Sequence, residues 1–207
     1  MEVEVKYCID DDTKISSISE DETLKALECK DTRELHCMHA VYYDTLDKDL
    51  GKIKAAFRVR LEGNLYVATI KMNGKVEDGI HQRFELNEMI FDDEFVENPS
   101  LKIFEINEDV RNALGDAIYK PIEPILEMNY VRELFDVEYE SSRMEVALDQ
   151  GDIWTPAGNA PICEIELELH EGNVEDLKSL GDIISSTYDL KPESRSKFAR
   201  GLELILD

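Results

Sequence analysis

Segments in which polar and aliphatic residues alternate recur along most of the chain. Side chains on a β-strand point to opposite faces with a period of two, so each such segment predicts a strand with one polar and one apolar face. The predicted strands are residues 2–6, 35–43, 56–62, 65–72, 81–88, 123–138, 143–150 and 160–169.

Other stretches have apolar residues at helical spacing. The predicted helical segments are residues 13–29 (one amphipathic helix or two short ones), 46–53 (a short turn), 99–118 (an excursion on the outside), 174–188 and 194–206. Gly172 or Asn173 is expected to open the helix at 174. The dipeptides Gly63-Asn64 and Asn73-Gly74 are typical of tight turns between antiparallel strands.

The polar faces of the predicted strands carry charges of both signs. The residues that share these faces are Glu2, Glu4 and Lys6; Arg58, Arg60 and Glu62; Lys71; His81, Arg83 and Glu85; Arg132; Glu145 and Asp149; and Glu164, Glu166 and Glu168. For any one strand, a half-buried sheet with its polar face in water explains the pattern equally well. For so many strands together, the pattern predicts a closed or nearly closed barrel with a charged bore, and a barrel of about eight strands can hold one small ligand.

The residue types in this bore indicate a particular chemistry. Carboxylates crowded at a spacing of two repel one another unless a cation lies among them, and hard oxygen ligands are those that Mg²⁺ or Mn²⁺ prefers. Arginine binds phosphate in a bidentate manner, and lysine supplies a compact point charge. The sequence therefore predicts a site for a polyphosphate chelated by a divalent metal, with His81 as a further hydrogen-bond donor to phosphate if it faces the bore.

These residues resemble the CYTH superfamily, whose members are also called triphosphate tunnel metalloenzymes. The signature of that family is an N-terminal E-x-E-x-K, which Glu2, Glu4 and Lys6 match. Further matches in the family's order are Tyr42-Tyr43-Asp44-Thr45, Arg58-Val59-Arg60, Thr69-Ile70-Lys71, Arg132, Glu164-Ile165-Glu166-Leu167-Glu168 and Ser196-Lys197-Phe198-Ala199-Arg200-Gly201. The first motif alone is a weak signal, whereas ordered matches over nearly the whole chain are a strong one.

Several stretches are most similar to the bacterial inorganic triphosphatase branch of that family. They are residues 79–83, 145–151, 161–164 and 196–201. Relatives in this branch often carry a second, helical, His-rich domain. The chain ends at Asp207 and has four histidines, so the resemblance is to the tunnel domain alone and residues 1–207 are expected to form a single domain.

The resemblance implies an α+β fold, an antiparallel closed barrel of roughly eight strands with helices packed outside. It also implies hydrolysis of inorganic triphosphate to pyrophosphate and phosphate with Mg²⁺ or Mn²⁺. The implied metal ligands are Glu2, Glu4, Asp149, Glu164, Glu166 and Glu168, with the pairs Glu2–Glu4 and Glu164–Glu166 expected at opposite walls. The implied substrate-binding residues are Lys6, Arg58, Arg60, Lys71, Arg83, Arg132, Lys197 and Arg200, of which Lys6, Arg58, Arg60 and Lys197 are the candidate catalytic residues.

Other functions stay open at this point. Within the family, the alternatives are a class IV-type adenylate cyclase and a hydrolase of nucleoside or thiamine triphosphate. A non-catalytic module that binds polyphosphate or a nucleotide is an alternative of another class. We disfavour the module because both carboxylate-rich segments are intact, whereas an idle module could lose one of them without cost.

Composition narrows the partners and the compartment. The net charge is −24, which excludes a nucleic-acid partner because nucleic acids need a basic footprint. Acidic runs fall in predicted loops and helix starts, so a small polyphosphate in a basic interior remains compatible with an acidic exterior. The chain shows neither a signal peptide nor a membrane-spanning run, which predicts a cytoplasmic protein without a membrane partner. The sequence does not determine the oligomeric state.

Overall fold

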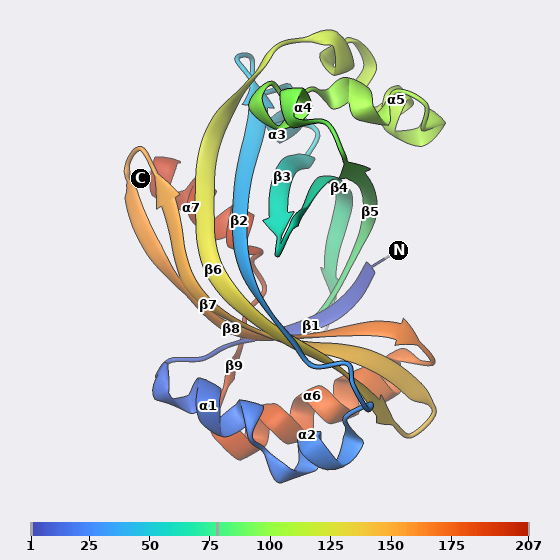
Figure 1. The fold of residues 1–207 in the computed structure, drawn as a ribbon, viewed down its shortest axis with the longest axis vertical. Helices are drawn as coiled ribbons and strands as arrows, with labels where there is room; N and C mark the ends of the chain where they lie inside the picture. The colour runs from blue at the N-terminus through green and yellow to red at the C-terminus, as the bar shows by residue number, and fades with distance from the viewer. Residues whose placement is uncertain (1, 78, 207) are drawn as a thin grey trace.

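The computed structural model describes residues 2–77 and 79–206, and over that range the chain forms one antiparallel sheet of nine strands. The strand order is β5-β4-β3-β2-β6-β7-β8-β1-β9, and β5 also pairs with β1. This additional pairing closes eight strands into a barrel, as predicted, and β9, which was not predicted, lies outside it (Figure 1). The strands are β1 (Glu2–Cys8), β2 (Glu34–Thr45), β3 (Ala56–Glu62), β4 (Leu65–Glu77), β5 (Ile80–Ile90), β6 (Ile122–Tyr139), β7 (Ser142–Thr155), β8 (Gly158–Glu171) and β9 (Lys191–Pro192).

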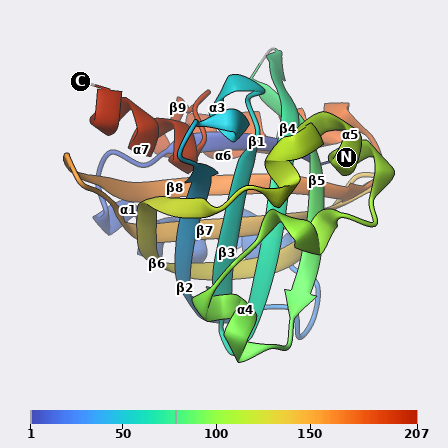
Figure 2. The ribbon, with the colours of Figure 1, turned by 90° about the horizontal axis from the view of Figure 1, so that it is seen from above.

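Helices cover the barrel on two sides (Figure 1). One group consists of α1 (Thr13–Ser19), α2 (Glu22–Leu27) and α6 (Val174–Tyr188). The other side carries α3 (Asp49–Lys52), α4 (Asp93–Glu97), α5 (Glu108–Leu114) and the 3₁₀ turns Leu101–Phe104 and Gly115–Tyr119. Figure 2 shows this second group above β2–β5. The prediction of helices outside a closed barrel is therefore confirmed.

The outward faces of the strands are apolar, and these helices pack on them. On one side, Val5 and Leu167 of the barrel contact a core that includes Leu177 and Leu180 of α6. On the other side, Phe57 and Ile70 belong to a core with the segments 101–118. The side chains of both cores are almost completely removed from water, so burial of apolar surface holds the helices to the wall.

A third core lies at one end of the barrel, where α7 (Lys197–Leu206) packs. Phe198 of this helix stacks on Tyr42 with ring centroids 4.7 Å apart, and Leu202 packs against the same cluster. Met128 and Ile153 complete the apolar surface beneath the helix. Hydrophobic packing therefore fixes α7 against the bore and determines where its charged residues point.

Of the two predicted tight turns, one is present and the other is not. Gly63 and Asn64 do connect β3 to β4, and Gly63 has a φ of 60°. Asn73-Gly74 is not a turn, because β4 continues to Glu77 and the pairing register with β5 shifts between Met72 and Lys75. The left-handed φ of 56° at Asn73 is therefore used in an irregularity of the strand rather than at its end.

The C-terminal helix also begins later than predicted. It starts at Lys197 rather than at 194, because the hydroxyl of Ser196 caps it by accepting a hydrogen bond from the backbone N–H of Ala199 at 3.1 Å. Before this cap, residues 191–192 pair with β1 as β9. The next residue, Glu193, donates its backbone N–H to the carbonyl oxygen of Lys6 at 3.0 Å. No helix of the described residues is both long enough and apolar enough to cross a membrane.

Candidate functional site

A cavity of about 760 Å³ lies within the barrel, lined by inward-facing strand positions and by α7. The predicted site residues that line it are Glu2, Glu4, Lys6, Arg58, Arg60, Lys71, Arg83, Arg132, Glu166, Glu168 and Lys197. Asp149 and Glu164 are fully buried and contact Lys197, and Arg200 contacts Glu164. The structure thus brings all the predicted site residues into one connected region.

The pairing register sets which of these side chains are neighbours. The opposed Cα pairs are Glu2 with Arg83, Glu4 with Glu168, Lys6 with Glu166, and Arg132 with Asp149. Because β1 lies beside β8, the expectation that Glu2–Glu4 and Glu164–Glu166 occupy opposite walls is wrong. The acids of β1 and β8 belong to one continuous part of the wall.

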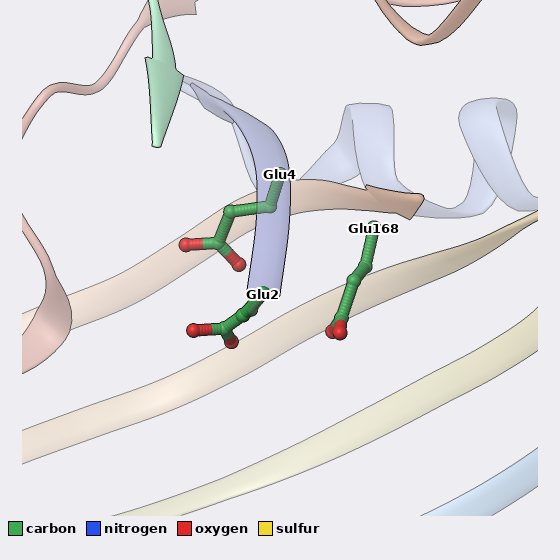
Figure 3. Close-up of side chains that lie close together, drawn as sticks. All are labelled: Glu2, Glu4 and Glu168. Carbon is green, nitrogen blue, oxygen red and sulfur yellow. The ribbon is translucent and has the colours of Figure 1, made fainter. Parts of the chain in front are cut away.

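Three carboxylates, Glu2, Glu4 and Glu168, form what we call the cavity-lining acidic group. One oxygen from each lies within 4.8 Å of the others. Figure 3 shows Glu2 and Glu4 on β1 and Glu168 on the neighbouring strand, with their carboxylates on the same side. Burial, followed by the charges of Glu2 and Glu4, raises the pKa of Glu168 to about 8. The negative charges of Glu2 and Glu4 therefore oppose ionisation of Glu168.

Cations contact the other members of this group, and Lys6 is one of them, with its Nζ 3.6 Å from Oε1 of Glu4. Arg83 donates from Nε to Glu2 and from Nη2 to Glu4 at 2.9 Å, and Lys71 donates to Glu2 at 3.1 Å. Burial opposes ionisation of Glu2, but Lys71 and Arg83 outweigh it and lower its pKa. Among the described residues, Glu168 has neither a hydrogen-bond partner nor an ion-pair partner.

Asp149, Glu164 and Glu166 form the buried acidic group. One oxygen from each again lies within 4.8 Å of the others. Lys197 enters this group from α7 and contacts Asp149 at 2.6 Å, Glu166 at 3.0 Å and Glu164. Burial opposes the charge of Lys197, yet these carboxylates raise its pKa well above the usual value. Arg200, one helical turn later, pairs with Glu164 at 2.7 Å.

Two further cations, Arg132 and Lys6, contact the carboxylates of this buried group. Arg132 donates to both oxygens of Asp149, at 2.7 and 2.6 Å, and to Glu166 at 2.6 Å. Lys6 lies 2.7 Å from Glu166. Burial again opposes ionisation of Glu166, but Lys197, Lys6 and Arg132 hold its pKa well below the usual value.

Arg58 is the exception among the cations of the bore. It is 8% exposed, and its Nε is buried without a hydrogen-bond partner among the described residues. No carboxylate pairs with it over the same range, although Tyr42 and Tyr130 help to raise its pKa against the effect of burial. Its neighbour Arg60 differs, because the guanidinium of Arg60 donates a hydrogen bond to Glu62 and its Nη1 lies 3.4 Å from the hydroxyl oxygen of Tyr130. A buried guanidinium without an anion is a strong indication of an anionic ligand.

Sequence reasoning left some contributors to the site unassigned. Tyr130 lies under Lys197, with Nζ 5.6 Å from the ring centroid, and it shares a strand face with Arg132. Its position two residues before Arg132 could have placed it in the bore. His81, expected as a phosphate donor, instead places its Nε2 3.0 Å from the backbone oxygen of Glu193, so it holds the segment that leads into α7.

The donor set of the cavity-lining acidic group fits a divalent metal. Three carboxylates converge, and one of them lacks a partner among the described residues. Hard divalent cations bind carboxylate oxygens of this kind. The buried acidic group has the same ligand types, but lysine and arginine side chains already contact its oxygens. Ligation of metal by Asp149, Glu164 and Glu166 stays a prediction.

Comparison with known proteins agrees with this arrangement. The sequence model of the CYTH domain matches residues 1–202. The inorganic triphosphatase of Haemophilus influenzae is 35% identical over 160 residues, which is 77% of this chain and 44% of that protein. The chain therefore spans less than half the length of this relative.

Solved structures share the fold at low sequence identity. A proposed adenylyl cyclase from Hippeastrum, described as having a dominant triphosphatase activity, aligns with a TM-score of 0.72 and 20% identity over 98% of this chain and 96% of its own. A proposed adenylate cyclase from Bacillus halodurans aligns with a TM-score of 0.59 and 19% identity over 97% and 96% of the two chains. At these identities the likeness concerns the fold alone.

Proposed function

The chain belongs to the CYTH domain family, and we propose that it hydrolyses inorganic triphosphate to pyrophosphate and phosphate in the presence of Mg²⁺ or Mn²⁺. The observation that carries the proposal is Arg58, a buried guanidinium with no carboxylate partner among the described residues, in a cavity that also holds three converging carboxylates. A ligand that satisfies both must be anionic and must carry or accept a divalent cation. We also propose that residues 1–207 act as one tunnel domain.

Metal binding in this proposal falls to the cavity-lining acidic group. Glu2, Glu4 and Glu168 would hold the divalent ion, and the ion would supply Lewis acidity that neutralises charge on phosphate oxygens. The buried acidic group has another role in our proposal: Asp149, together with Glu164 and Glu166, orients Lys197 and Arg132 toward the cavity.

Substrate binding falls to the cations of the bore. Arg58 and Arg60 would hold phosphate oxygens from one side, and Lys6, Arg132 and Lys197 from the other. Water attacks a terminal phosphorus, the bridging P–O bond to the rest of the chain breaks, and pyrophosphate leaves. This transfer needs little covalent chemistry from the protein, so positioning and charge stabilisation by these side chains would supply most of the rate acceleration.

An organic triphosphate is the second candidate substrate, and one feature of the cavity favours it. The wall next to α7 is apolar, with Met128, Phe198 and Leu202 among its lining residues. A cavity of about 760 Å³ lies within the range that small organic ligands occupy. The likeness to proposed adenylate cyclases is consistent with this alternative, but it concerns the fold alone.

Phosphate release from triphosphate, ATP and thiamine triphosphate, each with and without Mg²⁺ or Mn²⁺, tests the proposal. We expect kcat/KM for triphosphate to exceed that for ATP by at least about tenfold, equivalent to about 1.4 kcal/mol of transition-state binding. A higher value for ATP, or formation of cyclic AMP, would transfer the assignment to the organic triphosphates. Binding of these compounds without turnover would support a non-catalytic module.

A matched pair of variants tests the metal-binding role. Glu4→Gln keeps the shape of the side chain but removes a charge from the metal site, so we expect activity to collapse. Glu175→Gln makes the same chemical change on an exposed position of α6 and should retain full activity. Full activity in Glu4→Gln would refute the ligand assignment.

A further inference from the structure

The cations of the cavity differ in whether a carboxylate of the metal site already holds them. Arg83 donates to both Glu2 and Glu4, and Lys71 donates to Glu2. Arg58 lines the same cavity but contacts neither carboxylate, and its Nε has no partner among the described residues. Carboxylates of the metal site thus engage Arg83 and Lys71 before any ligand enters, and they also engage Lys6, whose Nζ lies 3.6 Å from Oε1 of Glu4.

The atoms that Arg83 and Lys71 contact are those that a divalent ion needs. Oε1 of Glu2 lies 3.1 Å from Nζ of Lys71 and 3.2 Å from Nη2 of Arg83, and Oε1 of Glu4 lies 2.9 Å from the same Nη2. A metal ion at these oxygens would place a double positive charge beside two single ones, and like charges at such distances repel strongly in a partly buried site. Binding of the ion and retention of these contacts therefore oppose each other.

The position of Arg83 and Lys71 determines where the two side chains would go if a metal ion displaced them. Both Arg83 and Lys71 line the cavity, so side chains released from Glu2 and Glu4 would remain there without anionic partners. Unpaired cations in a partly buried cavity favour an anion as their new partner. Lys71 has one alternative, because it also pairs with Glu85, whereas among the described residues Arg83 pairs only with Glu2 and Glu4.

We propose that Arg83, assisted by Lys71, is the internal counter-ion of the metal site and that a divalent ion releases it to bind the phosphates of the substrate. The inference rests on the proposed function for the identity of the two ligands. It predicts that metal and triphosphate bind with positive cooperativity, and linkage makes that coupling reciprocal. It also gives Arg83 opposite effects on the two ligands: it weakens metal binding in the free protein and strengthens triphosphate binding in the metal-loaded protein.

Titration of the full chain with Mn²⁺ in the absence of triphosphate, followed by electron paramagnetic resonance of the free ion, isolates the first effect. We expect Arg83→Gln to bind Mn²⁺ at least about fivefold more tightly than the wild type, because the competing cation is gone. Arg58→Gln is the matched control and should change Mn²⁺ affinity by less than about twofold, since Arg58 contacts no carboxylate of the metal site. Lys71→Gln should shift the affinity in the same direction as Arg83→Gln and serves as the second variant if Arg83→Gln does not fold.

Calorimetric titration with imidotriphosphate, an analogue whose P–N–P bridges resist hydrolysis, in the presence of saturating Mn²⁺ measures the second effect. Both Arg83→Gln and Arg58→Gln should bind the analogue at least about tenfold more weakly, so only Arg83→Gln combines tighter metal binding with weaker binding of the triphosphate group. Unchanged or weaker Mn²⁺ binding by Arg83→Gln and Lys71→Gln would overturn the inference. A wild type that binds no Mn²⁺ would overturn the metal site and this inference together. Tighter Mn²⁺ binding by the variants of a protein that does not hydrolyse triphosphate would support the counter-ion role and refute the proposed function instead.

Discussion

Replacement of Lys197 by methionine should destabilise the protein even in the absence of metal and substrate. The side chain is 8% exposed and contacts Asp149, Glu164 and Glu166, all of them buried. Methionine keeps most of the side-chain length and packing but removes the charge. Three carboxylates then lose a common partner in a site where water cannot replace it.

The size of the loss of stability depends on which cations still contact the three carboxylates. Removal of one partner from a buried ion pair typically costs about 3–5 kcal/mol. Here Arg132 still holds Asp149 and Glu166, and Arg200 still holds Glu164, so we expect the lower end, about 3 kcal/mol. For a domain of this size each kcal/mol lowers Tm by about 2–4 °C, which gives a decrease of about 6–12 °C.

Thermal unfolding followed by circular dichroism in a metal-chelating buffer measures this decrease. Lys178→Met makes the same substitution at an exposed position of α6 and should leave Tm within about 2 °C of the wild type. The double variant Lys197→Met with Glu164→Gln should recover part of the loss, because it removes the charge of one of the three carboxylates that lost Lys197 as a partner. A wild-type Tm for Lys197→Met, or strict additivity in the double variant, would refute the buried network as the cause.

Two further predictions concern stability. Without metal, folding raises the pKa of Glu168 from 4.5 to about 8, so the native state binds more protons than the unfolded state between these values and the free energy of unfolding falls as pH rises through that interval. Thermal melts from about pH 5 to pH 9 should therefore show the wild type losing stability relative to Glu168→Gln, and parallel curves would contradict the shift. Gly181→Ala should destabilise by about 1–3 kcal/mol in urea denaturation, because the added Cβ would lie 2.6 Å from Oη of Tyr7 and 3.0 Å from Cγ2 of Val5. Since alanine favours helix formation over glycine, increased stability would show that the contact between α6 and β1 yields readily.

Much of the architecture could be predicted because it depends on local geometry. Alternation along residues 2–6 places Glu2, Glu4 and Lys6 on one face of any strand that forms there, whatever its neighbours are. The helix that starts at Val174 was also predictable, since the side chain of Asn173 accepts a hydrogen bond from the backbone N–H of Asp176 at its beginning. These elements follow from residues a few positions apart.

The same local reasoning failed in two places. Asn73-Gly74 is a turn signal in isolation, but pairing of β4 with β5 on both sides of it keeps the chain extended as far as Glu77. The start of α7 at Lys197 has a local cause that was missed, since the hydroxyl of Ser196 accepts a hydrogen bond from the backbone N–H of Ala199 and caps the helix. At Asn73-Gly74, by contrast, hydrogen bonds to the neighbouring strand outweigh the local preference.

Alternation along the strands establishes which charges face the interior, whereas the packing of the barrel establishes which of them pair. Glu164, Glu166 and Glu168 lie on one face of β8, yet they divide between the two acidic groups, because alternate positions along a strand lie about 6.6 Å apart and each meets different neighbours. Closure of the barrel by β1 and β5 then brings Arg83 to Glu2 and Glu4. Arg58, on β3, has no carboxylate partner among the described residues. Alternation fixes the direction of a side chain, but an ion pair requires two chain segments to meet, and only the packed fold specifies that meeting.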